Sequence, residues 1–150
     1  MRPILMLALL CAVATNRATA GDDSVTATGT LYVTYNNGVG KDTERKLSAR
    51  FVPEGTAFSP PQGSPEPAQS VRHFNIDNPS RPVEALLRQP ERAKLSKDLM
   101  RVVAVPVTVV LRHRRRVMEC DAPADYATLV SAKAREPARP VSRDVAPIGC

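Results

Sequence analysis

The chain has 150 residues, with 21 lysine and arginine residues, 15 aspartate and glutamate residues and a formal net charge of +6. It has no tryptophan, 4% aromatic residues and two histidines, so an aromatic platform for nucleic acid and a histidine-rich metal site are both poorly supplied. This composition predicts one small basic domain and argues against specific nucleic-acid binding.

Residues 1–20 have the three-part layout of a secretory signal peptide. Arg2 supplies the positive start, residues 4–14 form an apolar run, and Ala18-Thr19-Ala20 is a small-residue cleavage motif. The apolar run is shorter than the roughly 20 residues that a transmembrane helix needs. We therefore expect cleavage after Ala20 and a chain that is secreted or periplasmic.

Residues 24–35, SVTATGTLYVTY, alternate between apolar side chains and hydroxyl side chains, which is typical of a strand with one buried and one wet face. Residues 36–40, NNGVG, tolerate the positive φ angles of a tight turn. Residues 43–52, TERKLSARFV, alternate again. The pattern predicts an amphipathic β-hairpin from Ser24 to Val52.

Residues 53–69 hold five prolines and two glycines in 17 positions and cannot keep a hydrogen-bonded ladder, because proline lacks the N–H donor. We expect a long, exposed, flexible Pro-rich loop. Phe58 is its large apolar residue, which either pins the loop to the core or is displayed to a partner.

The next segments predict a short strand and two short helices. Residues 70–76, SVRHFNI, have strand character. Ser80 can cap a helix that has Pro82 in its first turn, and Pro90 interrupts this helix. A second helical piece is predicted from Glu91 to Leu99.

Residues 101–112, RVVAVPVTVVLR, form the most apolar segment after the signal peptide and predict a buried strand. Both of its faces are apolar, which indicates either a layer on each side or a partner surface. Pro106 predicts an edge position or a bulge. An uncovered edge would allow association through an added strand.

Residues 112–116, RHRRR, follow directly. Strand alternation would place Arg112, Arg114 and Arg116 on one face, where guanidinium forks can bind phosphate, sulfate or carboxylate groups. We predict an anion contact at Arg112, Arg114, Arg115 and Arg116. Two alternatives are a solvated strand end or hairpin turn and a cleavage site, because residues 112–115 look like the R-x-(K/R)-R site of furin-type convertases.

Residues 121–135, DAPADYATLVSAKAR, fit helical and strand spacing almost equally, and we favour the helix. Residues 137–150 form a Pro-rich tail. Signal removal leaves Cys120 and Cys150 as the two cysteines, which predicts one disulfide in an oxidising compartment. Such a bridge stabilises a fold by roughly 3 to 4 kcal/mol in the chain-entropy model.

These patterns predict a small, single, β-rich domain over residues 21–136, either an all-β sandwich-like fold or an α+β fold. It would have antiparallel hairpins, one or two short helices, the Pro-rich loop and the disulfide. We find no HExxH, paired CxxC or GxSxG motif and assign no catalytic residue, metal ligand or cofactor.

The predicted function is a non-enzymatic binding or interaction module. Its partner would be another protein or a cell-envelope component, with the hairpin, the Pro-rich loop and the valine strand as candidate surfaces. The first alternative is a protein that binds an anionic polymer or membrane surface through Arg112 to Arg116. The second is a hydrolase or metal protein whose site is not visible in the sequence.

Overall fold

The computed structural model describes residues 24–36, 46–55, 58, 71–77, 79–98 and 101–145. The predicted signal peptide, its cleavage site after Ala20, most of the Pro-rich loop, and Cys150 lie outside these residues. Among the described residues, no helix is both long enough and apolar enough to cross a membrane.

Strands dominate the described chain, and the short helices lie between the third and fourth strands. In chain order the elements are β1 (Val25–Asn36), β2 (Lys46–Pro53), β3 (Phe74–Asp77), α1 (Ser80–Glu84), α2 (Gln89–Lys97), β4 (Val102–Glu119), β5 (Ala122–Ala134), β6 (Arg139–Val141) and the 3-10 turn η1 (Arg143–Val145). The β-rich prediction is therefore confirmed.

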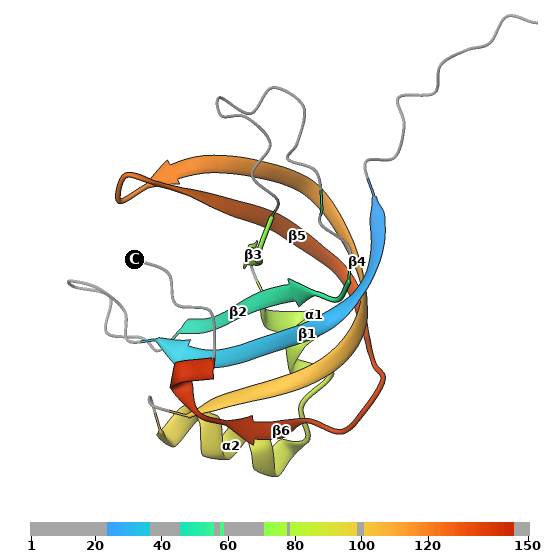
Figure 1. Cartoon of the computed structure of the whole chain (residues 1–150). Coiled ribbons are helices and arrows are strands. Elements are labelled where there is room, and N and C mark those ends of the chain that lie inside the picture. Colours follow the sequence, from blue (N-terminus) through green and yellow to red (C-terminus); the bar gives the residue numbers. More distant parts are fainter. Residues whose placement is uncertain are drawn as a thin grey trace, which may run out of the picture.

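The sheet closes into a barrel (Figure 1). Its strands follow the order β1-β2-β3-β5-β4, β4 pairs back onto β1, and β6 adds to β4. The β3–β5 pair is parallel and the other pairs are antiparallel. One sheet closed on itself replaces the two facing sheets of a sandwich. Five strands in this Greek-key order form the type of barrel known as the OB-fold.

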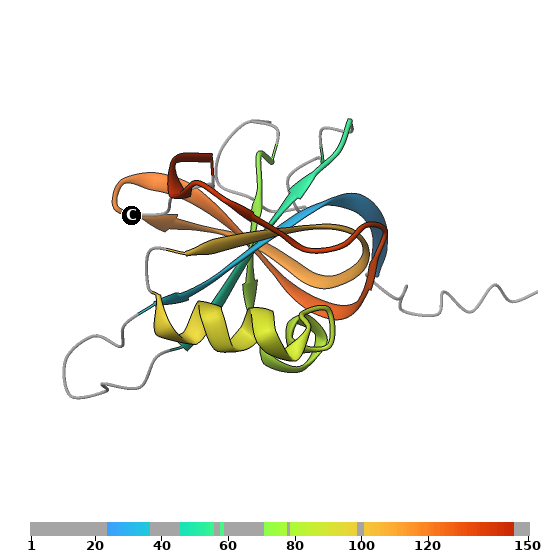
Figure 2. The ribbon, with the colours of Figure 1, turned by 90° about the horizontal axis from the view of Figure 1, so that it is seen from below.

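The core fills the inside of this barrel. From Val103 to Leu111, every second residue of β4 points inward, and these side chains are fully or almost fully buried: Val103, Val105, Val107, Val109 and Leu111. Phe51 and Phe74 add the largest buried rings. Val83 of α1, Leu95 of α2 and Leu87 from the segment between them join the same core, and the two helices lie across the lower end of the barrel (Figure 1 and Figure 2).

Gly29 allows β1 to pass close to β2 where the barrel closes. It pairs with Pro53 on one side and Val107 on the other. A Cβ atom at Gly29 would overlap the carbonyl oxygen of Val52 and lie 2.7 Å from the ring of Phe51. Glycine is therefore required for the backbone to approach this closely.

The helix favoured for residues 121–135 is wrong, because this segment is strand β5. Its inward positions are the buried residues Asp125, Ala127 and Leu129, which have strand spacing. The sequence pattern was nearly balanced, so the long pairing with β4, from Val107↔Ala134 to Glu119↔Ala122, decides the conformation. The prediction of two short helices is confirmed. The role predicted for Pro90 is wrong, because α1 already ends at Glu84 and Pro90 lies in the first turn of α2.

The expectation of an uncovered edge on the valine strand is also wrong. β4 pairs with β1 on one side and with β6 and then β5 on the other. Pro106 lies at the break between β6 and β5, and its carbonyl accepts the Arg135 N–H at 2.8 Å. In an antiparallel strand, the backbone nitrogen and carbonyl oxygen of one residue point to the same neighbouring strand. The nitrogen of Pro106, which has no hydrogen, therefore also faces the break between β6 and β5. The valines of β4 from Val102 to Val109 are buried in the core.

Candidate functional site

The arginine cluster lies on a long hairpin that extends beyond the barrel (Figure 1). The β1–β4 pairing ends at Val25↔Leu111, whereas β4 and β5 stay paired as far as Glu119↔Ala122. Cys120 and Asp121 form the turn with φ angles of 47° and 61°. Two central residues at positive φ define a type I′ turn, whose twist matches that of the strands.

A bulge in β4 changes the direction of its arginines. The register shifts between Arg112 and Arg115, and His113 within this stretch has a φ of 50°. Arg112 lies opposite Thr128, whereas Arg116 lies opposite Asp125. Because 125 and 128 differ by an odd number, these partners lie on opposite faces of β5. Arg112, Arg114 and Arg116 therefore do not form the single face that simple alternation predicts.

Arg116 forms a buried ion pair with Asp125, its register partner on β5. Nε and Nη2 of Arg116 each donate to a carboxylate oxygen of Asp125 at 2.8 Å. The side chains are 3% and 8% exposed. This bidentate pair holds the hairpin strands together, and its burial keeps Arg116 from an external polymer.

Arg115 ties the outer face of the hairpin to β3. Its guanidinium lies 4.9 Å from the centre of the Tyr126 ring and makes a bidentate pair with Asp77, with Nη2 to Oδ1 at 3.0 Å. The hydrogen bond to Asp77 raises the pKa of Arg115. The hydroxyl of Tyr126 donates to Glu119, and this bond together with burial raises the pKa of Tyr126 to about 12.

The outer face of the barrel carries a row of residues that are paired from strand to strand. Tyr32 pairs with Arg50, Arg50 with Asn75, Asn75 with Tyr126, and Tyr126 with Arg115. We call these five residues the tyrosine–arginine row. It crosses β1, β2, β3, β5 and β4, with one residue on each strand.

Arg50 is held within this row by its neighbour on β3. Its Nε donates to Oδ1 of Asn75 at 3.0 Å. Burial lowers the pKa of Arg50, and repulsion from Arg143 adds to this effect. The pKa of the nearby His73 is lowered by burial and by Arg50, which favours a neutral imidazole beside the row.

Tyr32, Arg50 and Asn75 were not recognised as site residues from the sequence. The outward positions of Tyr32 and Arg50 follow from the predicted hairpin. Their alignment with Tyr126 and Arg115 depends on the parallel β3–β5 pair and on the bulge, and local periodicity shows neither.

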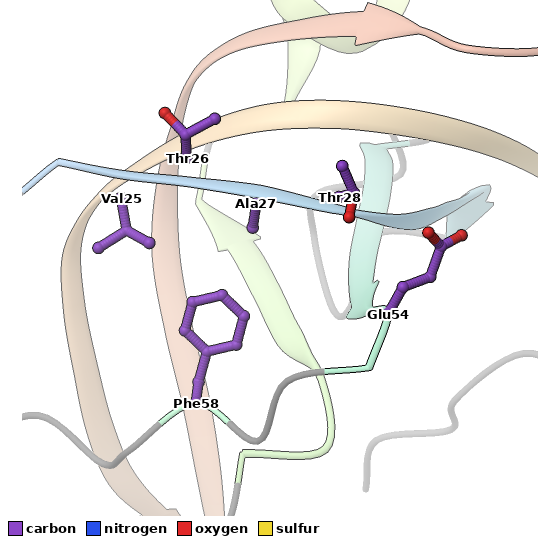
Figure 3. Close-up of a pocket in the computed structure, with 6 residues that line it drawn as sticks. All are labelled: Val25, Thr26, Ala27, Thr28, Glu54 and Phe58. Atoms are coloured by element: carbon purple, nitrogen blue, oxygen red, sulfur yellow. The ribbon is translucent and has the colours of Figure 1, made fainter.

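A hollow of about 390 Å³ lies at the upper end of the barrel beside β1 (Figure 3). Val25 and Ala27 point toward the ring of Phe58 in this hollow. Phe58 packs edge-on against Phe74 at 5.5 Å and forms a bridge with Val71. Of the two alternatives for Phe58, the structure supports the first, because its partly buried ring packs against the core.

Glu54 lines the hollow, and it pairs with Arg135 at 2.7 Å. Within the part of the chain that the structure describes, no three His, Cys, Asp or Glu side chains are grouped to hold a metal ion. Cys150 lies outside this part, so its pairing with Cys120 stays a prediction.

The convertase-like segment, residues 112–115, lies inside the β4–β5 ladder. A protease would have to open the hairpin to bind this segment as an extended chain. Comparisons with protein-family models, curated proteins and solved structures found no significant match.

Proposed function

We propose that this chain is an exported, non-enzymatic module that binds an anionic polymer. The surface that binds it would be the outer face of the barrel together with the β4–β5 hairpin. The observation that carries the proposal is that β4 places Arg112 and Arg115 on the same outer face, where β2 adds Arg50. Planar guanidinium groups bind carboxylate, sulfate and phosphate groups through paired hydrogen bonds.

The other surfaces that the sequence predicts are weaker candidates for partner binding. The valines of β4 are used by the core, and the barrel closes at β1–β4, so strand addition has less edge to use. OB-type barrels bind oligonucleotides and oligosaccharides on the face of strands 2 and 3, which is an argument by analogy of fold. Among the predicted anion contacts, we retain Arg112, Arg114 and Arg115 and assign Arg116 to the fold.

Export is proposed from residues 1–20 and from the two cysteines that remain after cleavage. Intact mass of the natively produced protein, with and without reduction, tests both points. We expect a chain that begins at Gly21 and lacks two hydrogens because Cys120 is bonded to Cys150. A chain that begins at Met1 and alkylates without reduction would contradict export.

Binding is tested with heparin, a soluble and densely anionic polymer. We expect the wild-type protein to bind at low salt and to release heparin as the salt concentration rises. The variant Arg112→Gln/Arg114→Gln should bind more weakly and with a shallower salt dependence. The control Lys94→Gln/Lys97→Gln removes the same charge from the exposed side of α2 and should bind like the wild type.

The proposal is contradicted if the wild-type protein does not bind heparin at low salt. It is also contradicted if the hairpin and helix variants lose affinity equally, because binding would then depend on net charge and not on this face.

A further inference from the structure

We propose that the ligand is an anionic polysaccharide that lies across the tyrosine–arginine row. Arg50 and Arg115 would bind two of its anionic groups, and Asp77 would be an internal anion that competes for Arg115. This inference rests on the proposed function and names the ligand class and the contact residues of that same face.

The direction of the ligand follows from the register of the sheet. The row has one residue on each of five neighbouring strands, so a polymer that follows it runs across the strands. Neighbouring strands lie about 4.8 Å apart, which places the Cα atoms of Arg50 and Arg115 about 14 Å apart along the sheet. Two cations at this spacing suit an extended polymer better than a single small anion.

Asp77 already shows how Arg115 binds an anion. The carboxylate of Asp77 accepts two hydrogen bonds from the guanidinium of Arg115, which is the fork geometry that carboxylate and sulfate groups use. The Arg115 side chain is 49% exposed, so an incoming anion can reach it. Tyr126 lies beneath the guanidinium and positions Arg115 without having to touch the ligand.

The other end of the row combines Arg50, Asn75 and Tyr32. Asn75 orients Arg50 through the bond at 3.0 Å, and its amide is a further hydrogen-bonding group. Tyr32 pairs with Arg50, and its half-buried ring offers an apolar surface with a polar tip. This set matches a sugar ring, which has an apolar face, hydroxyl groups and an attached carboxylate or sulfate.

The same features favour a polysaccharide over single-stranded nucleic acid. Stacking proteins for nucleic acid place successive bases on several rings, whereas the ring of Tyr126 is occupied by Arg115.

The first experiment measures heparin affinity for single variants of the row. We expect Arg50→Gln and Arg115→Gln each to weaken binding by about tenfold, the effect of one lost charge-assisted contact. Arg139→Gln removes one exposed charge from β6 and is the matched control, with unchanged affinity. Arg50→Lys retains the charge but not the fork and should recover part of the affinity. Thermal unfolding shows that each variant is folded.

The second experiment replaces the competing carboxylate. Asp77→Asn should tighten heparin binding several-fold while it leaves thermal stability equal or lower, because Arg115 gains an external partner and loses an internal one. A purely structural role for the Arg115–Asp77 pair predicts weaker or unchanged binding and would overturn this assignment.

The third experiment separates a sugar ligand from a simple polyanion. Tyr32→Thr should weaken heparin binding and leave inorganic polyphosphate binding unchanged, because polyphosphate has no ring to pack on Tyr32. An equal loss for both polymers, or tighter binding of oligo-deoxythymidine than of heparin at the same salt, would overturn the polysaccharide class.

These results are distinguishable from failure of the proposed function. If heparin binds and depends on Arg112 and Arg114 but not on Arg50 or Tyr32, the row is not the site, although the module still binds polyanions. If neither heparin nor polyphosphate binds at low salt, both proposals fall.

Discussion

The two halves of β4 are stabilised in different ways. From Val102 to Leu111 the strand has neighbours on both sides and points a row of aliphatic side chains into the core. From Arg112 to Glu119 it pairs with β5, and the contacts that hold it are ion pairs and hydrogen bonds. Apolar burial is not directional and tolerates a regular strand, whereas the ion pairs depend on the bulge, because it sets which arginine faces which way: Arg115 toward Asp77 and Arg116 toward Asp125.

The largest expected effect comes from breaking the buried ion pair of the basic half. Asp125→Asn leaves Arg116 buried without its charge partner, which should lower the free energy of unfolding by about 3 to 5 kcal/mol. Urea denaturation measures this loss. The double variant Arg116→Met/Asp125→Leu removes both charges and should recover most of the stability; equal losses in the single and double variants would contradict this account.

In the apolar half, Leu111→Ala should lower the free energy of unfolding by about 3 kcal/mol, because it leaves a cavity at a fully buried site. Met118→Ala, in the basic half at 52% exposure, is the comparison and should change stability by less than about 0.5 kcal/mol. Similar losses at the two positions would mean that the hairpin is packed like the core.

A substitution in the turn between β4 and β5 should raise the free energy of unfolding, and by a smaller amount. Asp121 has a φ of 61°, so Asp121→Gly should raise the free energy of unfolding by up to about 1 kcal/mol, partly offset by the greater freedom of glycine in the unfolded chain. Gly55 has a φ of 69° in open space, and Gly55→Ala should therefore destabilise by about 1 kcal/mol. Thermal unfolding measures the stability of both variants. If both substitutions stabilise the protein, or both destabilise it, the role given to φ is contradicted.

The last comparison concerns alkaline pH. The pKa of Tyr126 rises from 10.0 to about 12 on folding, so the neutral phenol is favoured in the folded state. This contribution is complete below pH 10 and is lost between pH 10 and 12. Tyrosinate absorbance should show one tyrosine that ionises near pH 12, and Tyr126→Phe should remove this phase. Ionisation of all tyrosines near pH 10 would show that the Glu119 bond does not persist in solution.

Much of the barrel was predictable from local patterns. The alternation in β1 and β2 indicates their hairpin, and the run of β-branched residues indicates a buried β4. Burial of a strand can be recognised from the order of apolar and polar residues along the sequence. Ser80 and Pro82 likewise indicate where the first short helix begins. These features depend on neighbours in the chain.

The candidate site was predicted in part. The sequence pointed to Arg112, Arg114, Arg115 and Arg116, but it could not show that Arg116 is buried while Arg115 faces outward. That division follows from the bulge, which is defined by the pairing of β4 with β5.

The amino-acid sequence alone determined a β-rich domain, its first hairpin, its buried valine strand and its basic cluster, because each of these features depends on residues that are close together in the chain. The tertiary structure alone decided that residues 122–134 form a strand, that the sheet closes through β1 and β4, and that Tyr32, Arg50, Asn75, Tyr126 and Arg115 share one row. The physical reason is that strand pairing between distant segments sets register, and register determines which side chains meet.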